Sequence, residues 1–277
     1  MVKNIFSKLL KPYIIAEAGI NHNGKLQTAY DLVDVAKKNG ANAIKFQTYD
    51  TKKRIGNLNK KIFKILKKCE LSYNEFEKLS NYCKLKKITF VSTPFDEEAV
   101  DFLESIKVPF YKIASFDISN YQLIKKIIKT KKFTIVSTGM ASFSEIKKIY
   151  KLFRSKGINL GILHCVSSYP NFEDSSYLSN ISFLQKNFKC TIGISDHTND
   201  IKIPIYGTLL GANIIEKHIK INDRHKCVDS AVSITGKQLK ILRSEVDKIS
   251  KILSKPKFGV RPEESGIKIF KRKKIYN

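Results

Sequence analysis

Short apolar segments alternate with longer amphipathic segments along almost the whole chain. The short segments are rich in Ile, Val and Phe, which is typical of strands buried on both faces of a parallel sheet. They predict strands over residues 13–17, 43–47, 88–92, 110–113, 134–137, 161–164, 191–194 and 213–216.

The amphipathic segments predict helices near 25–39, 73–86, 96–106, 120–129, 143–155, 175–187, 199–210 and 236–253. Eight strand–helix units in one chain predict an α/β fold, a (β/α)8 TIM barrel. An open doubly wound sheet is the alternative, but no GxGxxG or P-loop motif follows any predicted strand. Capping boxes, in which Ser or Thr precedes Glu or Gln by three residues, are expected at Ser72/Glu75, Ser119/Gln122, Ser142/Glu145 and Thr235/Gln238.

The chain divides into an N-terminal preface (1–12), the barrel (13–253) and a basic tail (254–277). It contains neither an apolar run long enough to cross a membrane nor a secretory signal. Its five cysteines are scattered and form no CxxC motif. We therefore expect a reduced, cytoplasmic protein.

The formal net charge is +26, from 51 basic and 25 acidic residues. Such an excess first suggests nucleic acid or an anionic membrane surface as a partner. Arginine, the usual reader of phosphate and guanine, is scarce, and the lysines are spread over amphipathic segments as solvated helix faces. We therefore expect no nucleic-acid and no membrane partner, whereas an anionic small substrate suits this charge.

Polar side chains gather where the predicted strands end, which is where a barrel carries its active site. Lys45 and Lys112, beside Ser and Thr hydroxyls, predict a cradle for phosphate or carboxylate. The polar ends are Glu17; Lys45 and Gln47; Thr93; Lys112 and Ser115; Ser137 and Thr138; His164; Ser195, Asp196 and His197; and Glu216, Lys217 and His218.

His197 and His218 follow neighbouring strands at equivalent points. Neighbouring strands lie about 4.8 Å apart, so the two imidazoles can bind one divalent ion and leave positions for water and substrate. This spacing indicates an exchangeable, catalytic metal site. His22 and His225 are expected in loops, and His164 in a structural hydrogen bond.

The motifs IIAEAGINHNG, AIKFQTY, FVSTPFD, YKIASFD, VSTGM, LHCVSSYP, GISDHT and IEKHI occur in this order between about residues 13 and 243. Together they resemble the N-acetylneuraminate (sialic acid) synthase family, whose relatives also make legionaminic and pseudaminic acids. The resemblance implies a (β/α)8 barrel that condenses phosphoenolpyruvate with an N-acetylmannosamine-type sugar. It also implies a divalent metal, usually Mn²⁺, with Mg²⁺ or Co²⁺ as alternatives.

The resemblance assigns roles by motif. Glu17, Lys45 and Lys112 would be catalytic, and His197 and His218 would hold the metal. Which carboxylate performs which proton transfer stays open. Phosphoenolpyruvate would contact Lys45, Thr93, Lys112, Ser115, Ser137, Ser167 and Ser195, and the sugar would contact Gln47, Asp117, Tyr169 and Asp229.

Three departures from the family pattern affect these roles. Ser167-Ser168-Tyr169 stands where the family often has Asn-Ile-Tyr, and Asp117 stands for a Glu. The family continues into an antifreeze-like domain that supplies an Arg to the partner subunit's sugar site, and the sequence stops before it. Either the sequence is truncated before that domain, or the barrel works alone with weaker or altered sugar recognition. If the barrel alone binds the sugar tightly, Arg261 and Arg272 of the tail are the first candidates to replace that Arg.

The expected partners are phosphoenolpyruvate and an N-acetylated hexosamine, and a homodimer is left open. One alternative is a barrel synthase for an eight-carbon or seven-carbon keto-sugar acid, which GINHNG and SDHT disfavour. Another is a weakened paralogue that binds sugar or a partner protein, which the intact set of Glu17, the two lysines and the two histidines disfavours. A lysine-driven nucleic-acid or membrane binder comes last.

Overall fold

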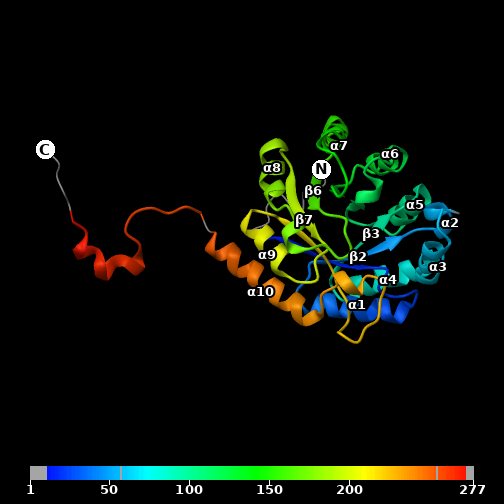
Figure 1. Ribbon diagram of the computed structural model, residues 1–277, viewed down its shortest axis with the longest axis horizontal. Helices are drawn as coiled ribbons and strands as arrows, with labels where there is room; N and C mark the ends of the chain where they lie inside the picture. Colours follow the sequence, from blue (N-terminus) through cyan, green and yellow to red (C-terminus); the bar gives the residue numbers. More distant parts are fainter. Residues whose placement is uncertain (1–10, 57, 254, 273–277) are drawn as a thin grey trace.

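The computed structural model describes residues 11–56, 58–253 and 255–272. Within this part of the chain, eight parallel strands form one sheet in the order β3-β2-β1-β8-β7-β6-β5-β4, and β3 and β4 contact each other across the remaining seam. The sheet curls into a nearly closed barrel, as predicted (Figure 1). The strands are β1 (Tyr13–Gly19), β2 (Ala43–Thr48), β3 (Thr89–Pro94), β4 (Tyr111–Ile113), β5 (Thr134–Ser137), β6 (Leu160–Cys165), β7 (Thr191–Asp196) and β8 (Ile214–His218).

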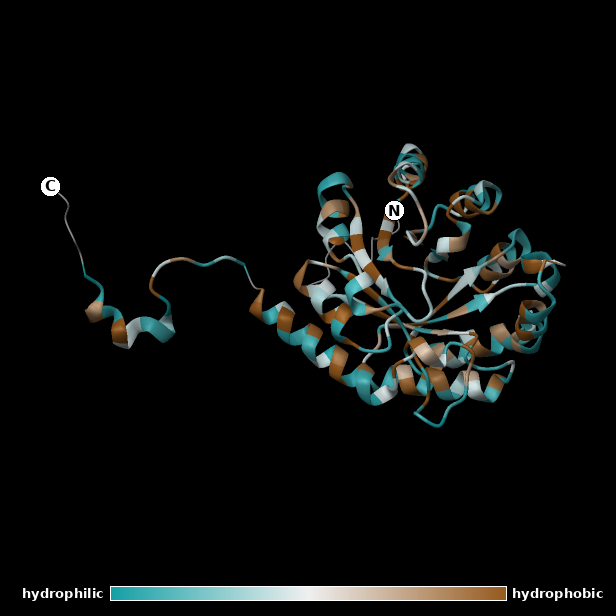
Figure 2. Cartoon of the chain, in the orientation of Figure 1, coloured by the Kyte–Doolittle hydropathy of each residue, from teal (hydrophilic) through white to brown (hydrophobic). Residues whose placement is uncertain are grey.

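Helices surround the barrel, and hydrophobic and hydrophilic residues alternate along most of their ribbons (Figure 2). The predicted helices are α1 (Leu26–Lys38), α4 (Tyr73–Leu85), α5 (Glu97–Ser105), α6 (Tyr121–Lys129), α7 (Phe143–Ser155), α8 (Ser179–Asn187), α9 (Lys202–Leu209) and α10 (Gly236–Ile252). Apolar residues of α1 and α4 to α10 pack in the core against the strands. Two further helices that the sequence analysis did not predict, α2 (Thr51–Ile55) and α3 (Lys60–Cys69), lie between β2 and α4. Short 3-10 turns are η1 (Ser115–Asp117), η2 (Glu173–Ser175), η3 (Ser230–Val232) and η4 (Pro262–Phe270).

The predicted helix starts are mostly correct. Ser72 and Ser142 each form a complete capping box with the glutamate three residues on. Gln238 accepts a hydrogen bond from the Thr235 N–H. The box expected at Ser119 is wrong, because Asn120 caps α6 instead and the Ser119 hydroxyl donates to Glu145 of α7.

The boundaries of the domain follow from these elements. Regular structure of the barrel begins at Tyr13 and ends at Ile252. Residues 1–10 of the expected preface, and residues 254 and 273–277 of the expected tail, lie outside the described residues. Among the described helices, none has the length and apolar character that a membrane crossing requires. All five cysteines are described, and all are free thiols.

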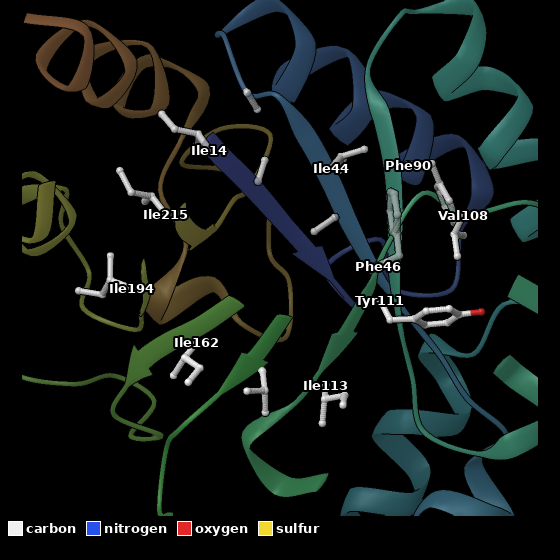
Figure 3. Close-up of a cluster of buried hydrophobic side chains, with 14 of the residues drawn as sticks. Ile14, Ile44, Phe46, Phe90, Val108, Tyr111, Ile113, Ile162, Ile194 and Ile215 are labelled. Carbon is white, nitrogen blue, oxygen red and sulfur yellow. The ribbon is translucent and has the colours of Figure 1, made fainter. Parts of the chain in front are cut away.

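Successive strand residues point alternately outward and into the barrel, as the period of two in a strand requires. Outward-pointing side chains such as Ile14, Phe46 and Ile215 form the large core between strands and helices (Figure 3). A second, smaller apolar cluster fills the barrel interior and consists of Tyr13, Ile15, Ala43, Val91, Phe110, Phe133, Ile135, Leu163 and Ile214. The interior positions that follow this cluster are mostly polar and form the mouth of the barrel.

Candidate active site

A polar cavity opens at the carboxyl ends of the strands. It contains about 440 Å³ of empty space, its open mouth included. Every strand contributes to it either from its own residues or from those directly after it. The lining is Glu17, Lys45, Gln47, Arg54, Thr93, Phe95, Lys112, Ala114, Ser115, Phe116, Ser137, Cys165, Tyr169, Ser195, His197, Glu216 and His218.

Two lysines and two glutamates are buried at the floor of this cavity, each between 2% and 6% exposed. Lys45 Nζ lies 2.9 Å from Glu17 Oε2 and donates to Thr93 Oγ1 at 3.0 Å. Lys112 Nζ donates to Ser137 Oγ at 2.7 Å and lies 3.7 Å from Glu216 Oε1. Residues expected to bind one anion are thus brought together from β2, β3, β4 and β5.

Glu216 links the two lysines. Its Oε2 lies 3.7 Å from Lys45 Nζ, and its Oε1 accepts a hydrogen bond from Ser195 at 2.9 Å. The sequence analysis noted Glu216 as a strand end but gave it no role. Since a buried charge is costly unless it is paired, the four charges hold one another in place. We define Glu17, Lys45, Lys112 and Glu216 as the floor quartet.

The floor quartet shifts the pKa values of its members. Burial raises the pKa of Glu17 from 4.5 to about 7, although Lys45 opposes this effect. Burial alone would raise the pKa of Glu216 as well, but Lys112 and Lys45 together lower it. Glu17 is therefore the carboxyl that can exchange a proton near neutral pH, whereas Glu216 stays ionised.

Three hydroxyl or backbone groups extend the anion cradle toward β5 and β6. Ser115 Oγ accepts a hydrogen bond from the Gly139 N–H at 3.0 Å. A Cβ on Gly139 would lie only 2.1 Å from Ser167 Oγ and 2.8 Å from Ser115 Oγ, so this position requires glycine. Ser167 therefore lies beside Ser115, although it does not line the main cavity.

The residues expected to face a sugar lie mainly on the β1, β2 and β8 side. Gln47 Nε2 donates to Glu17 Oε1 at 3.4 Å. Gly19 has φ +53°, and a Cβ there would lie 3.3 Å from Asp229 Oδ2, 3.3 Å from Glu17 Oε1 and 3.4 Å from Gln47 Nε2. These three side chains thus surround Gly19. Glu17 lies between the anion cradle and this second group.

Tyr169 and Asp117 complete the predicted sugar set from the opposite side. The Tyr169 ring lies 4.1 Å from the His197 ring, centroid to centroid, and lines the cavity. Asp117, on η1, accepts a hydrogen bond from Asn120 at 3.1 Å and does not line the cavity. The structure therefore places Gln47 and Tyr169 in the cavity lining and Asp229 beside His218 and Gly19, whereas Asp117 stays outside the lining.

His197 and His218 face the same cavity, with ring centroids 5.5 Å apart. His197 Nδ1 bonds the Val166 carbonyl at 2.8 Å, so this nitrogen carries the proton and Nε2 is free to bind a metal. Buried His218 Nδ1 has no hydrogen-bond partner and lies 3.5 Å from Asp229 Oδ2. Burial, reinforced by His197, holds the pKa of His218 well below its usual value, so its ring is neutral.

These features fit a divalent ion held by few protein ligands. Two imidazoles with a nearby carboxylate are ligands that transition metals accept. Among the described residues, no group of three or more His, Cys, Asp or Glu side chains forms a closed metal site. An ion bound here would keep positions for water and substrate, as catalytic metals do.

Other polar strand-end residues point away from the cavity. His164 bonds the Ser176 carbonyl at 2.6 Å, in the structural role expected of it. Lys217 is fully buried, pairs with Asp196 at 2.6 Å and also donates to the Thr198 carbonyl. Strand alternation separates these residues from their neighbours His197, Glu216 and His218, which point inward.

Five lining residues were not predicted, and two of them, Arg54 and Cys165, carry side chains that can take part in chemistry; the others are Phe95, Ala114 and Phe116. Arg54 was missed because helix α2, which carries it, was not predicted. Cys165 was read as an ordinary thiol, yet its Sγ lies 3.6 Å from Ser115 Oγ. The signal for Cys165 was present, since it stands two residues after the inward-pointing Leu163 on β6.

Known proteins share this sequence and this fold. The NeuB family matches residues 32–257. An N,N'-diacetyllegionaminic acid synthase from Campylobacter jejuni is 34% identical, over 95% of this chain and 84% of its own length. A pseudaminic acid synthase from the same species is 31% identical, over 95% of this chain and 80% of its own length. A sialic acid synthetase from Leptospira borgpetersenii, whose crystal structure was determined in complex with citrate, is 37% identical in sequence. Its structure superimposes with a TM-score of 0.92 and covers 98% of this chain and 95% of its own.

Proposed function

This chain belongs to the NeuB family, and on that premise we propose that it condenses phosphoenolpyruvate with a 2-acetamido sugar of the N-acetylmannosamine type. The products are a nine-carbon, sialic-acid-like α-keto acid and phosphate. The observation that carries the proposal is the floor quartet, which places two buried ammonium groups beside a carboxyl of near-neutral pKa. A polyanionic substrate and a proton transfer are both suited to that arrangement.

The anion cradle binds phosphoenolpyruvate in this proposal. Lys45 and Lys112 neutralise its phosphate and carboxylate, because charge-assisted hydrogen bonds are the strongest available in a buried site. Hydroxyls already bonded to the lysines, those of Thr93 and Ser137, are within reach of the same anion. Ser115, Ser167 and Ser195 supply further hydrogen bonds around it.

The sugar occupies the other side of the mouth. Gln47, Tyr169 and Asp229 bind its hydroxyl and acetamido groups, and Asp117 contacts it from the rim. Glu17 touches both halves, through Lys45 on one side and Gln47 on the other. The reacting carbons of the two substrates therefore meet above Glu17.

The reaction forms one carbon–carbon bond and one carbon–oxygen bond, from water to C2, and breaks the carbon–oxygen bond between C2 and the phosphate. C3 of phosphoenolpyruvate attacks the aldehyde carbon of the open-chain sugar, whose oxygen takes up a proton and becomes a hydroxyl, while positive character develops at C2. Glu17, in its ionised form, stabilises that charge and takes a proton from the water that adds at C2. Collapse of the C2 adduct releases phosphate, whose negative charge Lys45 and Lys112 stabilise.

His197 and His218 would hold a divalent metal, for which Mn²⁺ is our proposal and Mg²⁺ or Co²⁺ the alternatives. When bound, such an ion supplies Lewis-acid polarisation of a carbonyl oxygen. The protein's own contribution is to orient both rings and to keep His218 neutral. The Val166 carbonyl fixes the His197 tautomer, and burial suppresses protonation of His218.

A phosphate-release assay tests the proposed function. Purified protein is mixed with phosphoenolpyruvate, Mn²⁺ and a panel of N-acetylated hexosamines, and both phosphate and the keto acid are measured. We expect sugar-dependent release of one phosphate per keto acid. Release that does not depend on the sugar, or no release with any member of the panel, would refute the proposal.

Metal binding is tested separately from turnover. Electron paramagnetic resonance of added Mn²⁺ should show bound ion with the unmodified protein, and His197→Ala and His218→Ala should each release it. His225→Gln serves as the control, because His225 lies outside the cavity lining. Equal Mn²⁺ binding by all four proteins would show that the two histidines do not hold the metal.

A further inference from the structure

Arg54 is a guanidinium group placed at the mouth of a barrel whose other cations are almost all lysines. It is one of six arginines beside 45 lysines in the chain. Its neighbours on α2, Lys52 and Lys53, are exposed, whereas Arg54 is half-buried and lines the cavity. Where α2 faces solvent the chain uses lysine, and where it faces the cavity it uses arginine.

The Arg54 guanidinium is positioned by contacts with residues of the barrel itself. Its central carbon lies 3.6 Å from the centroid of the Phe95 ring and 4.8 Å from that of Tyr49. Nη1 donates to Gln47 Oε1 at 3.0 Å. A guanidinium has five N–H donors, and Gln47 takes only one of them among the described residues. The other N–H groups of the guanidinium are therefore held in place by the same contacts that orient the group.

The surroundings of Arg54 are those of the predicted sugar side. Gln47 touches it directly, and Asp117, Asp229 and Tyr169 are near enough to oppose the lowering of its pKa by burial. Among the described residues neither carboxylate forms an ion pair with Arg54; Asp117 accepts a hydrogen bond from Asn120, and Asp229 lies beside His218. Arg54 therefore contacts Gln47 and lies within electrostatic reach of the other three residues expected to face a sugar.

We propose that Arg54 binds the acceptor sugar directly, donating its free N–H groups to oxygen atoms of that sugar. This inference rests on the proposed function, since it names a specificity residue for the same site. Phosphoenolpyruvate is held by Lys45 and Lys112 on the floor, so Arg54 acts on the second substrate only. Lysine at position 54 keeps the charge but loses the planar face that stacks on Phe95 and the fork of donors.

Steady-state kinetics of Arg54→Lys and Arg54→Met test the inference, with Lys53→Met as the matched control on the same helix. We expect both Arg54 variants to raise the sugar KM tenfold to a hundredfold, with Arg54→Met the larger. The phosphoenolpyruvate KM should change less than about twofold, and thermal unfolding should show that the variants fold. Lys53→Met should leave both KM values unchanged.

The double variant Arg54→Met/Gln47→Leu separates direct contact from positioning of Gln47. If Arg54 contacts the sugar, the double variant has a higher sugar KM than Gln47→Leu alone. Equal values would overturn the inference, as would an unchanged sugar KM or a selective rise of the phosphoenolpyruvate KM in the single variants. An unmodified protein that releases no phosphate with any sugar overturns the proposed function and this inference with it. Turnover by the unmodified protein with an unaffected Arg54→Met overturns the inference alone.

Discussion

The interior of this barrel has two ends with opposite chemistry, although both are built from the same inward-pointing positions of the same strands. Toward the amino ends lie Ile15, Phe110, Ile135, Leu163 and Ile214. Two residues further along each of these segments lie Glu17, Lys112, Ser137, Cys165 and Glu216. One end therefore has a packing role and the other a chemical role, and a single step of the strand period separates them. Substitutions at the two ends should accordingly affect different measurements.

Glu17→Gln should have the largest effect on turnover. A positioned general base contributes about 10²–10⁴-fold, so we expect kcat to fall by that factor. The pKa of Glu17 is raised to about 7, so the acid limb of the pH–rate profile of the unmodified protein should centre near that pH. The kcat values of both proteins, measured from pH 5 to 9, check this expectation. A variant that keeps the limb would show that another group titrates.

The same substitution should change how stability depends on pH. The folded state keeps a proton on Glu17 that the unfolded chain releases between pH 4.5 and about 7, so the free energy of unfolding should decrease across this window. Glu17→Gln removes that part of the decrease. Urea unfolding at pH 5 and pH 8 measures how much the free energy of unfolding changes with pH in the unmodified protein and in Glu17→Gln. An identical change in the two proteins would contradict the raised pKa.

Leu163→Ala, at the apolar end, should mainly lower stability. Leu163 is fully buried inside the barrel, and such truncations cost about 2–5 kcal/mol. We expect the urea midpoint to fall while the KM values for phosphoenolpyruvate and sugar stay within twofold of those of the unmodified protein. A selective rise of one KM without loss of stability would break the division between the two ends.

Lys45→Met and Lys112→Met, at the polar end, should mainly weaken phosphoenolpyruvate binding. Removing one charge-assisted partner costs about 1.5–3 kcal/mol, which is roughly a tenfold to 150-fold rise in KM. Lys126→Met is the matched control, because Lys126 pairs with Asp101 on the surface. Unchanged kinetics in both floor variants would remove the two lysines from the site.

Ser137→Ala should give the smallest effect. It removes one hydroxyl that accepts a hydrogen bond from Lys112 at 2.7 Å, while the Ile113 carbonyl still accepts from the same ammonium at 3.0 Å. Because the ammonium keeps its charge and a remaining acceptor, the loss should be close to that of an ordinary hydrogen bond, about 0.5–1.5 kcal/mol, so the phosphoenolpyruvate KM should rise about two- to tenfold. A rise as large as that of Lys112→Met would show that the hydroxyl is essential rather than supportive.

The barrel strands could be predicted because each is a short apolar run with clear polar boundaries. The strand predicted over 134–137 agrees with β5, and the others differ by one or two residues at an end. Helix α2 was missed because it is only five residues long and has a single apolar residue, Ile55. Helix α3 was missed although its apolar residues recur at helical spacing between its lysines. Asn120, rather than Ser119, caps α6, because both residue types are good caps and spacing alone does not choose between them.

The site was predictable as far as strand ends define it. The sequence placed polar residues near the mouth, and strand alternation then sends Glu216 and His218 inward and Lys217 outward. Contacts between distant segments could not be foreseen. Arg54, on α2, contacts Phe95 after β3 and Gln47 on β2, and Ser167, after β6, lies against Gly139, after β5.

The ion pairs within the floor quartet also raise the free-energy cost of binding an anion at this site. Lys45 and Lys112 already have internal acceptors, so an entering anion must displace carboxylate and hydroxyl oxygens instead of filling a vacant space. A chloride ion can pair with only one of the two ammonium groups. It therefore provides fewer favourable contacts than the carboxylate and hydroxyl contacts that it displaces. A molecule with a phosphate at one end and a carboxylate at the other engages both ammonium groups at once. If the site binds phosphoenolpyruvate as proposed, the internal ion pairs therefore favour this polyanion over simple salts.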